Sequence, residues 1–190
     1  MNKYIFASSN NHKILELSHR VPHLDICSLA DIGYHEEIIE SGFTLEENAR
    51  IKAKTIYDKY KIASISDDTG LEVDYLQGQP GVFSARYAGQ PSDSKNNIIK
   101  LLKEMEGVKN RRAVFRTVIC LINNDKEIFF EGVVQGTITD QIYGHNGFGY
   151  DPIFIPVGFE RTFAQISLAE KNQISHRAKA IQKLVDYLQI

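Results

Sequence analysis

The segment Tyr4–Leu29 reads YIFASSNNHKILELSHRVPHLDICSL and has the pattern of a strand, a helix and a second strand. The apolar run Tyr4–Ala7 predicts a short buried strand, and the polar residues after it favour a turn with Asn10 as a helix N-cap. Apolar residues then recur three or four positions apart, which predicts a helix over residues 11–20. Leu24–Leu29 has the pattern of the second strand. A β-α-β start of this kind indicates an α/β fold.

Helices and strands continue to alternate along the rest of the chain. Thr44 and Glu47 have the spacing of a capping box, which predicts a helix that reaches about Tyr60. A second capping box begins at Ser167 and predicts one C-terminal helix to about Leu188. The other predicted elements are a strand over residues 63–65, a helix over 96–105, and a hairpin formed by 113–122 and 126–139. These elements predict an α/β fold with a mixed sheet.

The composition is that of an ordinary globular protein. The 190 residues are 43% hydrophobic and contain no Pro/Gly-rich linker, so we expect a single domain over residues 1–190. The formal net charge of −2 gives no reason to expect broad binding to nucleic acid or to an anionic membrane. Cys27 and Cys120 lie far apart without a CxxC pattern, which argues against a disulfide framework or a zinc site. Because neither a signal peptide nor a membrane-spanning stretch is evident, we expect a cytoplasmic location.

Two adjacent carboxylates, Asp67 and Asp68, lie in the stretch Ser64–Val73, SISDDTGLEV, after the predicted strand over 63–65. Acidic side chains at the end of a strand can hold Mg²⁺, which prefers oxygen ligands. Water at such a metal can be activated for attack on phosphorus. An Asp-Thr-Gly sequence is equally typical of a surface turn. The stretch alone leaves both interpretations open.

Glu40 and Glu47 need separate interpretations. Glu47 has a structural role as the capping-box partner of Thr44. Glu40 precedes a Ser-Gly turn and has no such role, so it is either a solvated loop residue or a ligand for a hard cation.

The segment Ser8–Lys13, SSNNHK, places a helix start directly after a strand and a polar turn. Backbone N–H groups at a helix N-terminus, with Lys13 one turn further on, suit a phosphate group. The chain contains neither the GxxxxGK[ST] spacing of a P-loop nor GxGxxG. A simple N-cap at Asn10 and a solvated Lys13 are the alternatives to a phosphate site.

The loop His145–Pro152, HNGFGYDP, combines glycines with two aromatic residues and a carboxylate. Aromatic faces can stack on a base, and Asp151 can accept hydrogen bonds from a purine edge. The alternative is a tight turn whose rings, Phe148 and Tyr150, pack in the core. A basic set near the start of the predicted C-terminal helix is either solvated or able to bind phosphate and purine: Lys171, His176 and Arg177.

Hard-metal carboxylates, cations suited to phosphate and an aromatic-Gly loop together indicate a nucleoside triphosphate handled with Mg²⁺ but without a P-loop. With these residues the chain resembles the inosine/xanthosine triphosphate pyrophosphatase family over almost its whole length. The segments that carry the resemblance are SSNNHK (Ser8–Lys13), ESGFTLEENARIKA (Glu40–Ala53), SDDTGLEV (Ser66–Val73), QPGVFSARYAG (Gln79–Gly89), FGYDPIF (Phe148–Phe154) and LAEKNQISHRAKA (Leu168–Ala180). The family usually has Thr-Gly-Asn where this chain has Ser8-Ser9-Asn10, and loss of that Gly is expected to constrain the turn.

The resemblance implies an elongated, twisted mixed sheet with helices on both faces and two lobes around a central cleft. It implies hydrolysis of ITP, dITP and XTP to the monophosphate and pyrophosphate, with Mg²⁺ as cofactor and a homodimer as the assembly. By resemblance, Glu40 and Asp68 are metal ligands and Asp68 also accepts the proton of the attacking water. The implied substrate-binding residues are Ser8, Ser9, Asn10, Asn11, His12, Lys13, Lys52, Thr69, Phe148, Gly149, Tyr150, Asp151, Lys171, His176 and Arg177. Supporting roles are implied for Asp67, Glu47 and Arg86.

Two other functions compete with this one. The first is the same chemistry on an ordinary pyrimidine triphosphate, against which the FGYD and SHR segments argue. The second is a nucleotide-binding module without turnover, which the presence of all the expected carboxylates disfavours. A site that donates a hydrogen bond to the purine O6 would reject adenine, whose 6-amino group is itself a donor.

Overall fold

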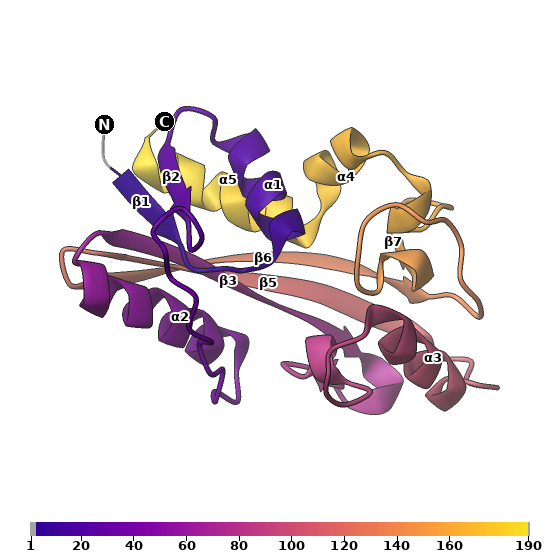
Figure 1. The fold of residues 1–190 in the computed structure, drawn as a ribbon. Coiled ribbons are helices and arrows are strands. Elements are labelled where there is room, and N and C mark those ends of the chain that lie inside the picture. The colour runs from indigo at the N-terminus through magenta and orange to yellow at the C-terminus, as the bar shows by residue number, and fades with distance from the viewer. Residues whose placement is uncertain (1–2, 190) are drawn as a thin grey trace. The chain divides into compact units, whose positions relative to one another are not determined.

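A computed structural model describes residues 3–189 of the chain as a mixed sheet with helices packed against it (Figure 1). The α-helices are α1 Asn11–Arg20, α2 Leu45–Tyr60, α3 Ser94–Glu104, α4 Leu168–Ile174 and α5 His176–Leu188. The strands are β1 Lys3–Phe6, β2 Asp25–Ser28, β3 Ala63–Val73, β4 Pro80–Gly81, β5 Arg112–Asn123, β6 Lys126–Ile138 and β7 Phe154–Pro156. The strand order is β2-β1-β3-β5-β6-β7, with β4 paired to β3. Since β1 is parallel to β2 and β3 while β7 is antiparallel to β6, the predicted α/β fold with a mixed sheet is confirmed.

The chain divides into two compact units, which we describe separately. The first unit comprises Met1–Asp68, Thr117–Gly132 and Arg177–Ile190. The second unit comprises Thr69–Arg116 and Val133–His176. The prediction of a single domain over residues 1–190 therefore stays a prediction.

In the first unit, helices cover both faces of the strands, and β1 shows why (Figure 1). Successive side chains of a strand point to opposite faces. Tyr4 and Phe6 accordingly join a buried cluster with Leu17 of α1 and with Ile181 and Leu184 of α5. Ile5 and Ala7 instead join a cluster with Ile56 of α2. The two apolar faces of one short strand thus place α1 and α5 on one side and α2 on the other.

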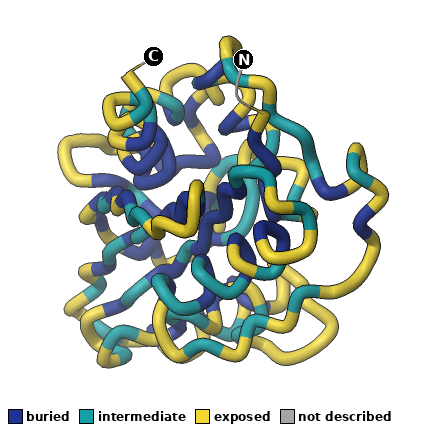
Figure 2. The backbone as a smooth tube through the Cα atoms, turned by 90° about the vertical axis from the view of Figure 1, so that its left-hand side faces the viewer, coloured by how far each residue is buried: buried dark blue, intermediate teal, exposed yellow. Residues whose placement is uncertain are grey.

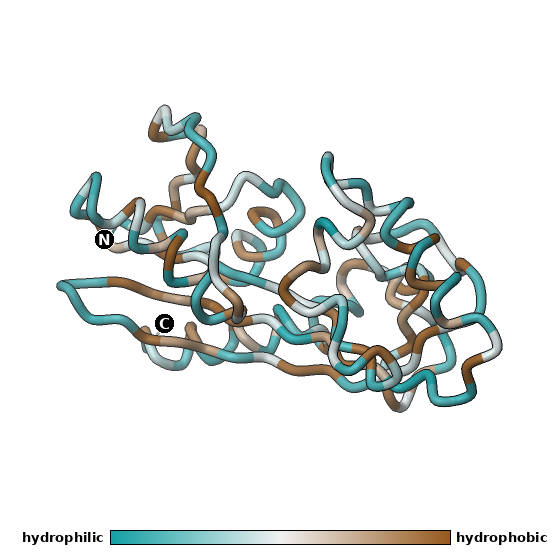
Figure 3. Tube along the Cα trace, turned by 90° about the horizontal axis from the view of Figure 1, so that it is seen from below, coloured by the Kyte–Doolittle hydropathy of each residue, from teal (hydrophilic) through white to brown (hydrophobic). Residues whose placement is uncertain are grey.

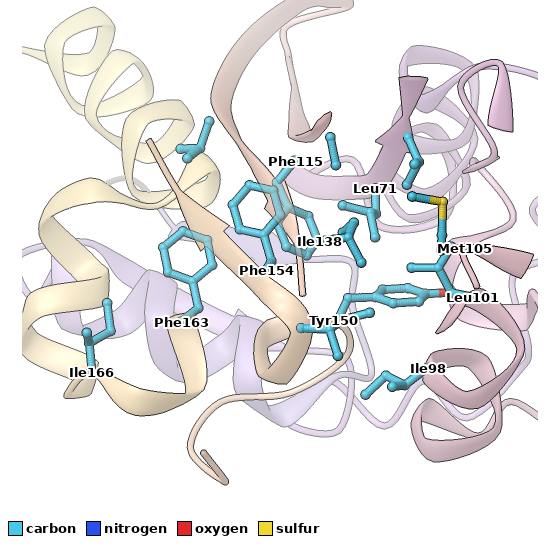
Figure 4. Close-up of a cluster of buried hydrophobic side chains, with 14 residues drawn as sticks. Leu71, Ile98, Leu101, Met105, Phe115, Ile138, Tyr150, Phe154, Phe163 and Ile166 are labelled. Carbon is cyan, nitrogen blue, oxygen red and sulfur yellow. The ribbon is translucent and has the colours of Figure 1, made fainter. Parts of the chain in front are cut away.

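The second unit has its own core, which Figure 4 shows in close-up. Helix α3 contributes Ile98 and Leu101, and its C-cap residue Met105 joins them. Three aromatic rings lie together in the same core, with ring centroids 4.6 Å apart for Phe115 and Phe154 and 5.3 Å apart for Phe154 and Phe163. These contacts hold β5, β7 and the segment after β7 together.

The predicted hairpin is present as β5 and β6. Asn124 and Asp125 connect the two strands with φ of 48° and 60°, the left-handed conformation that Asn and Asp tolerate best in turns. Hydrophobic residues lie along the strands, whereas the connection is hydrophilic (Figure 3). Buried residues lie mainly on the strands and the inner helix faces, and exposed residues on the loops (Figure 2).

Two predicted boundaries are wrong. The strand predicted over residues 63–65 does not end at the aspartates, because β3 continues without a turn to Val73. Gly70 permits this continuation, since a Cβ there would lie 2.7 Å from the carbonyl oxygen of Gly81 on the neighbouring β4. The single C-terminal helix is in fact two helices, α4 and α5, because Ser175 has an extended backbone with ψ of 158°.

The predicted starts of α1, α2 and α4 agree with their capping geometry, whereas α3 begins at Ser94, two residues before the predicted start at residue 96. Asn10 caps α1, Asp93 caps α3, and the capping boxes at Thr44 and Ser167 are both formed. Among the described residues, no helix combines the length and the apolar character that crossing a membrane requires.

Candidate active site

The continuation of β3 separates the two adjacent aspartates. Because neighbouring side chains in a strand point to opposite faces, Asp67 and Asp68 meet different partners within the first unit. Asp67 contacts Lys13 of α1 and Arg177 of α5, whereas Asp68 contacts Lys52 of α2. The predicted Asp-Asp pair is therefore two distinct charged clusters, one on each face of the strand.

The Asp67 cluster is a buried series of alternating charges. The Asp67 carboxylate lies 3.0 Å from Lys13 Nζ and 3.0 Å from Arg177 Nε, and Arg177 also lies 2.6 Å from Glu16. Burial alone would raise the pKa of Asp67, but the charges of Lys13 and Arg177 outweigh it and hold the pKa well below its usual range. Burial lowers the pKa of Lys13 although Asp67 opposes this shift. Asp67 therefore remains ionised and binds two cations directly.

In the Asp68 cluster, two carboxylates converge on one positive charge. Lys52 Nζ lies 2.5 Å from Glu40 Oε1 and 3.2 Å from Asp68 Oδ1. Burial raises the pKa of Asp68, and the charges of Lys52 and Lys13 partly offset this effect. Burial would lower the pKa of Lys52, but Asp68 and Glu40 outweigh it and raise the pKa. The predicted metal ligands thus lie together around a position that accepts a cation.

These two oxygen ligands fit a hard cation only in part. The described residues contain no group of three or more His, Cys, Asp or Glu side chains placed to hold a metal. Mg²⁺ commonly binds through one or two carboxylates and completes its shell with waters and substrate phosphates. Glu40 and Asp68 are consistent with that type of site, and their role as ligands stays a prediction.

The segment Ser8–Lys13 forms the start of α1. The Asn10 side chain accepts hydrogen bonds from the backbone N–H groups of His12 and Lys13, so Asn10 is an N-cap, as one interpretation of the sequence proposed. Ser8 Oγ accepts from the Asn10 N–H at 3.2 Å. Ser9 is not among the described residues with positive φ, so the turn does not need the glycine that this chain lacks. Asn11 and His12 are exposed.

Glu47 has the structural role that its spacing predicted. Its carboxylate accepts hydrogen bonds from the backbone N–H groups of Phe43 and Thr44, and Thr44 Oγ1 accepts from Glu47 N. The capping-box prediction is confirmed. A second role for Glu47 beside a metal stays a prediction.

In the second unit, the loop before β7 is held by a buried ion pair. Lys171 Nζ lies 2.6 Å from Asp151 Oδ2, and the same oxygen accepts from the Phe148 N–H at 2.8 Å. Lys171 Nζ also lies 4.7 Å from the centre of the Phe148 ring, a cation–π distance. Phe148 and Gly149 are half-buried, whereas Tyr150 packs in the core and donates its hydroxyl to the Ser84 carbonyl. The alternative interpretation, in which both rings of this loop pack in the core, therefore holds for Tyr150 but not for Phe148.

The structure separates the basic residues that the sequence grouped on one helix. Lys171 lies on α4, while His176 and Arg177 begin α5 after the break at Ser175. His176 is buried in the second unit, where its ring stacks on Phe115 with centroids 4.5 Å apart. Arg177 belongs to the first unit and to its Asp67 cluster. Their roles in substrate binding stay predictions.

Two other predicted residues, Arg86 and Thr69, belong to the second unit. Arg86 is half-buried, and its guanidinium lies 5.3 Å from the centre of the Phe83 ring. Thr69 is half-buried and continues β3 in the second unit.

Sequence reasoning missed two buried polar residues of the first unit, Glu16 and Asn48. Glu16 follows Lys13 by three positions on α1, so the two side chains share one face of the helix. Asn48 precedes Lys52 by four positions on α2, and the same spacing rule could have found it.

The chain is similar to known proteins over nearly its whole length. Residues 4–187 match the model of the Ham1 family. A dITP/XTP pyrophosphatase of Flavobacterium psychrophilum is 52% identical over 184 residues, which are 96% of this chain and 97% of that protein. The Staphylococcus aureus Ham1 protein structure matches with a TM-score of 0.91 and 39% identity, covering 99% of this chain and 98% of that chain. A HAM1 protein from Coxiella burnetii matches with a TM-score of 0.92 and 36% identity, covering 100% and 99%.

Proposed function

The chain belongs to the Ham1 family, and we propose that it hydrolyses deaminated purine nucleoside triphosphates, namely ITP, dITP and XTP, to the monophosphate and pyrophosphate. The observation that carries the proposal is the convergence of Glu40 and Asp68 on one cation position. The 52% identical relative that is named a dITP/XTP pyrophosphatase supports the same substrate class.

We assign the polyphosphate to the cations of the first unit. Lys13 and Lys52 are positive side chains beside Asp67 and Asp68, and a triphosphate carries about four negative charges that need such partners. The start of α1 is the positive end of the helix dipole, which favours an anion there, although the Asn10 side chain already accepts from the His12 and Lys13 N–H groups. Ser8–Lys13 and Thr69 complete the proposed phosphate contacts.

Glu40 and Asp68 are the proposed ligands of Mg²⁺. When bound, the metal would neutralise charge on the phosphates and on the pyrophosphate leaving group. Asp68 would accept a proton from the attacking water, whose oxygen forms the new bond to the α-phosphorus while the α–β anhydride bond breaks. A base in this role contributes about 10²–10⁴-fold to the rate.

We assign the purine to the second unit. The half-buried ring of Phe148 offers a face for stacking, and the Lys171 ammonium beside it can donate a hydrogen bond. Deaminated purines carry a carbonyl at C6, which accepts from such a donor, whereas adenine presents an amino group. Gly149, Tyr150, Asp151 and His176 support this recognition in our proposal, whereas Arg177 has its proposed substrate-binding role in the first unit, beside Asp67. Asp151 acts by fixing Lys171 and the Phe148 backbone.

A pyrophosphate-release screen tests the proposal. The purified protein is assayed with ITP, dITP, XTP, GTP, ATP and pyrimidine triphosphates, each with Mg²⁺ and with excess EDTA. We expect release from the deaminated purines only, and its loss in EDTA. Release chiefly from a pyrimidine triphosphate would favour the alternative substrate, and no release from any nucleotide would favour a binding module.

The variant Asp68→Asn separates catalysis from binding. We expect it to lose pyrophosphate release while nucleotide binding, measured by calorimetry, is largely kept. Near-full turnover by this variant would contradict the assignment of Asp68. We further propose a single functional domain over residues 1–190, a homodimer, and a cytoplasmic location without nucleic-acid or membrane partners.

A further inference from the structure

Asn48 is a fully buried amide that joins the segment carrying Glu40 to the Asp68 carboxylate. Its Oδ1 accepts a hydrogen bond from the Gly42 backbone N–H at 2.8 Å. Its Nδ2 donates to Asp68 Oδ2 at 3.4 Å. One side chain thus contacts both of the chain segments that supply the proposed metal ligands.

The packing around Gly42 shows how closely the two segments fit. A Cβ at position 42 would lie 2.6 Å from Glu47 Cβ and 2.7 Å from Asn48 Oδ1, distances that real Cβ atoms essentially never show. The capping-box carboxylate of Glu47 holds the next backbone N–H, that of Phe43, at 2.7 Å. The segment between Glu40 and α2 is therefore fixed by two neighbouring side chains of the helix.

The chemistry of position 48 is specific to asparagine. The residue needs an acceptor for the Gly42 N–H and a donor for Asp68, and an amide supplies both from one short side chain. Aspartate could accept from Gly42 but would oppose Asp68 with a second negative charge. Asn48 and Lys52 lie one helical turn apart, so the same face of α2 contacts Asp68 twice.

We propose that Asn48 is a positioning residue that sets the Glu40 segment and the Asp68 carboxylate relative to each other before a cation or a nucleotide binds. Groups that orient metal ligands commonly matter by about 10–100-fold in metal affinity or activity. The catalytic consequence rests on the proposed function, whereas the structural consequence does not.

Three variants and one control separate the two contacts. Asn48→Asp keeps the acceptor for Gly42 but loses the donor for Asp68, and Asn48→Ala loses both. Gly42→Ala disturbs the first contact from the opposite side. Ile56→Val is the control, because Ile56 is a buried apolar residue of α2, and its shortening lowers stability without touching a polar contact.

The first measurement is amide hydrogen exchange at Gly42, followed by NMR in the protein without nucleotide or divalent cation. We expect Asn48→Ala to speed this exchange by about 10-fold or more, because the N–H loses its acceptor. Asn48→Asp is expected to keep exchange near the wild-type rate. Unchanged exchange at Gly42 in Asn48→Ala, relative to Ile56→Val, would overturn the proposal.

The second measurement is Mn²⁺ affinity together with kcat and KM for ITP. In Asn48→Asp, Asn48→Ala and Gly42→Ala we expect Mn²⁺ affinity and kcat each to fall by about 10–100-fold, while KM changes by less than about threefold. Mn²⁺ affinity in both Asn48 variants equal to that of Ile56→Val would contradict the positioning of the two ligands. A kcat in both Asn48 variants equal to that of Ile56→Val would refute the catalytic part. If the wild-type protein hydrolyses no triphosphate, the proposed function fails, and Gly42 exchange and Mn²⁺ affinity still decide whether Asn48 positions the two segments.

Discussion

Asp67→Asn is expected to destabilise the protein strongly, because it removes the negative charge that the buried Arg177 and the half-buried Lys13 share. The substitution keeps the size and shape of the side chain, so the packing of β3 is retained. Lys13 and Arg177, each 3.0 Å from the carboxylate, lose their ionic partner at this position.

The expected size follows from the burial of these groups. The Asp67 and Arg177 side chains are only 1% and 2% exposed, and breaking a buried ion pair by removing one partner costs about 3–5 kcal/mol. Two features place the expected cost at the lower end, at about 3 kcal/mol. Arg177 keeps Glu16 at 2.6 Å, and the Lys13 side chain, 14% exposed, can turn partly toward water.

The assay is urea unfolding at neutral pH, followed by far-UV circular dichroism and by tyrosine fluorescence. Coincidence of the two transitions would justify a two-state fit of the free energy of unfolding. Glu127→Gln is the matched control, since it breaks the exposed pair between Glu127 and Arg50 and should cost less than about 1 kcal/mol. If Asp67→Asn lowers the free energy of unfolding by no more than the control does, the buried charge of Asp67 does not stabilise the fold as we infer.

Three further predictions concern residues away from these clusters. Gly147→Ala places a Cβ 2.0 Å from Asp151 Oδ2 at a φ of +75°. We therefore expect the free energy of unfolding to fall by more than about 1 kcal/mol, which is measured as a lower Tm. An unchanged Tm would contradict this prediction. Arg111→Met removes the guanidinium donors of hydrogen bonds to several backbone carbonyl oxygens, so urea unfolding should show a free energy of unfolding lower by about 2–3 kcal/mol. An unchanged free energy of unfolding would contradict this prediction. Burial raises the pKa of the Cys120 thiol from 9.0 to about 12, which lowers the thiolate fraction at pH 8 by roughly 10³-fold. Cys120 should therefore react slowly with a thiol reagent in the folded protein and rapidly in urea. The reaction rate of the folded protein should rise as pH increases. Fast reaction at pH 8 without urea would show that the thiol is not buried in this way.

Much of the fold could be predicted because local signals and tertiary packing agree. The helix over residues 11–20 was predicted with its Asn10 cap, and the structure has α1 at Asn11–Arg20. The hairpin was placed by its polar connection, where Asn124 and Asp125 adopt left-handed conformations. In each of these elements, the turn or cap residue indicates the same boundary as the spacing of the apolar residues does.

The failures have the opposite cause, because long-range pairing there overrides a local signal. Asp-Thr-Gly is good turn chemistry, yet Leu71 pairs with Gly81 and keeps β3 extended through Gly70. Ser175 carries no strong helix-breaking signal of its own, and its extended backbone separates α4 from α5. Neither the partner strand nor the break can be inferred from residues within a few positions.

The pairing that keeps β3 extended also determines which partners Asp67 and Asp68 meet. In a turn, Asp67 and Asp68 would be two adjacent carboxylates, and only the family resemblance assigns them different roles, metal ligand and proton acceptor for Asp68 and support for Asp67. In the continuous strand β3, the side chains of Asp67 and Asp68 point to opposite faces. Asp67 contacts two cations, Lys13 and Arg177. Asp68 contacts one cation, Lys52, which also pairs with Glu40.

The charges on the two faces therefore differ. Asp67 and Glu16 balance Lys13 and Arg177, whereas Glu40 and Asp68 outweigh Lys52 by one negative charge. A divalent cation gains more from the face with excess negative charge, where oxygen ligands already converge. This difference supports the assignment of Mg²⁺ to the Asp68 face and leaves Asp67 to fix the Lys13 ammonium. It also explains why a neutral donor, the Asn48 amide, is suited to hold Asp68: it adds a hydrogen bond without cancelling the charge that a metal needs.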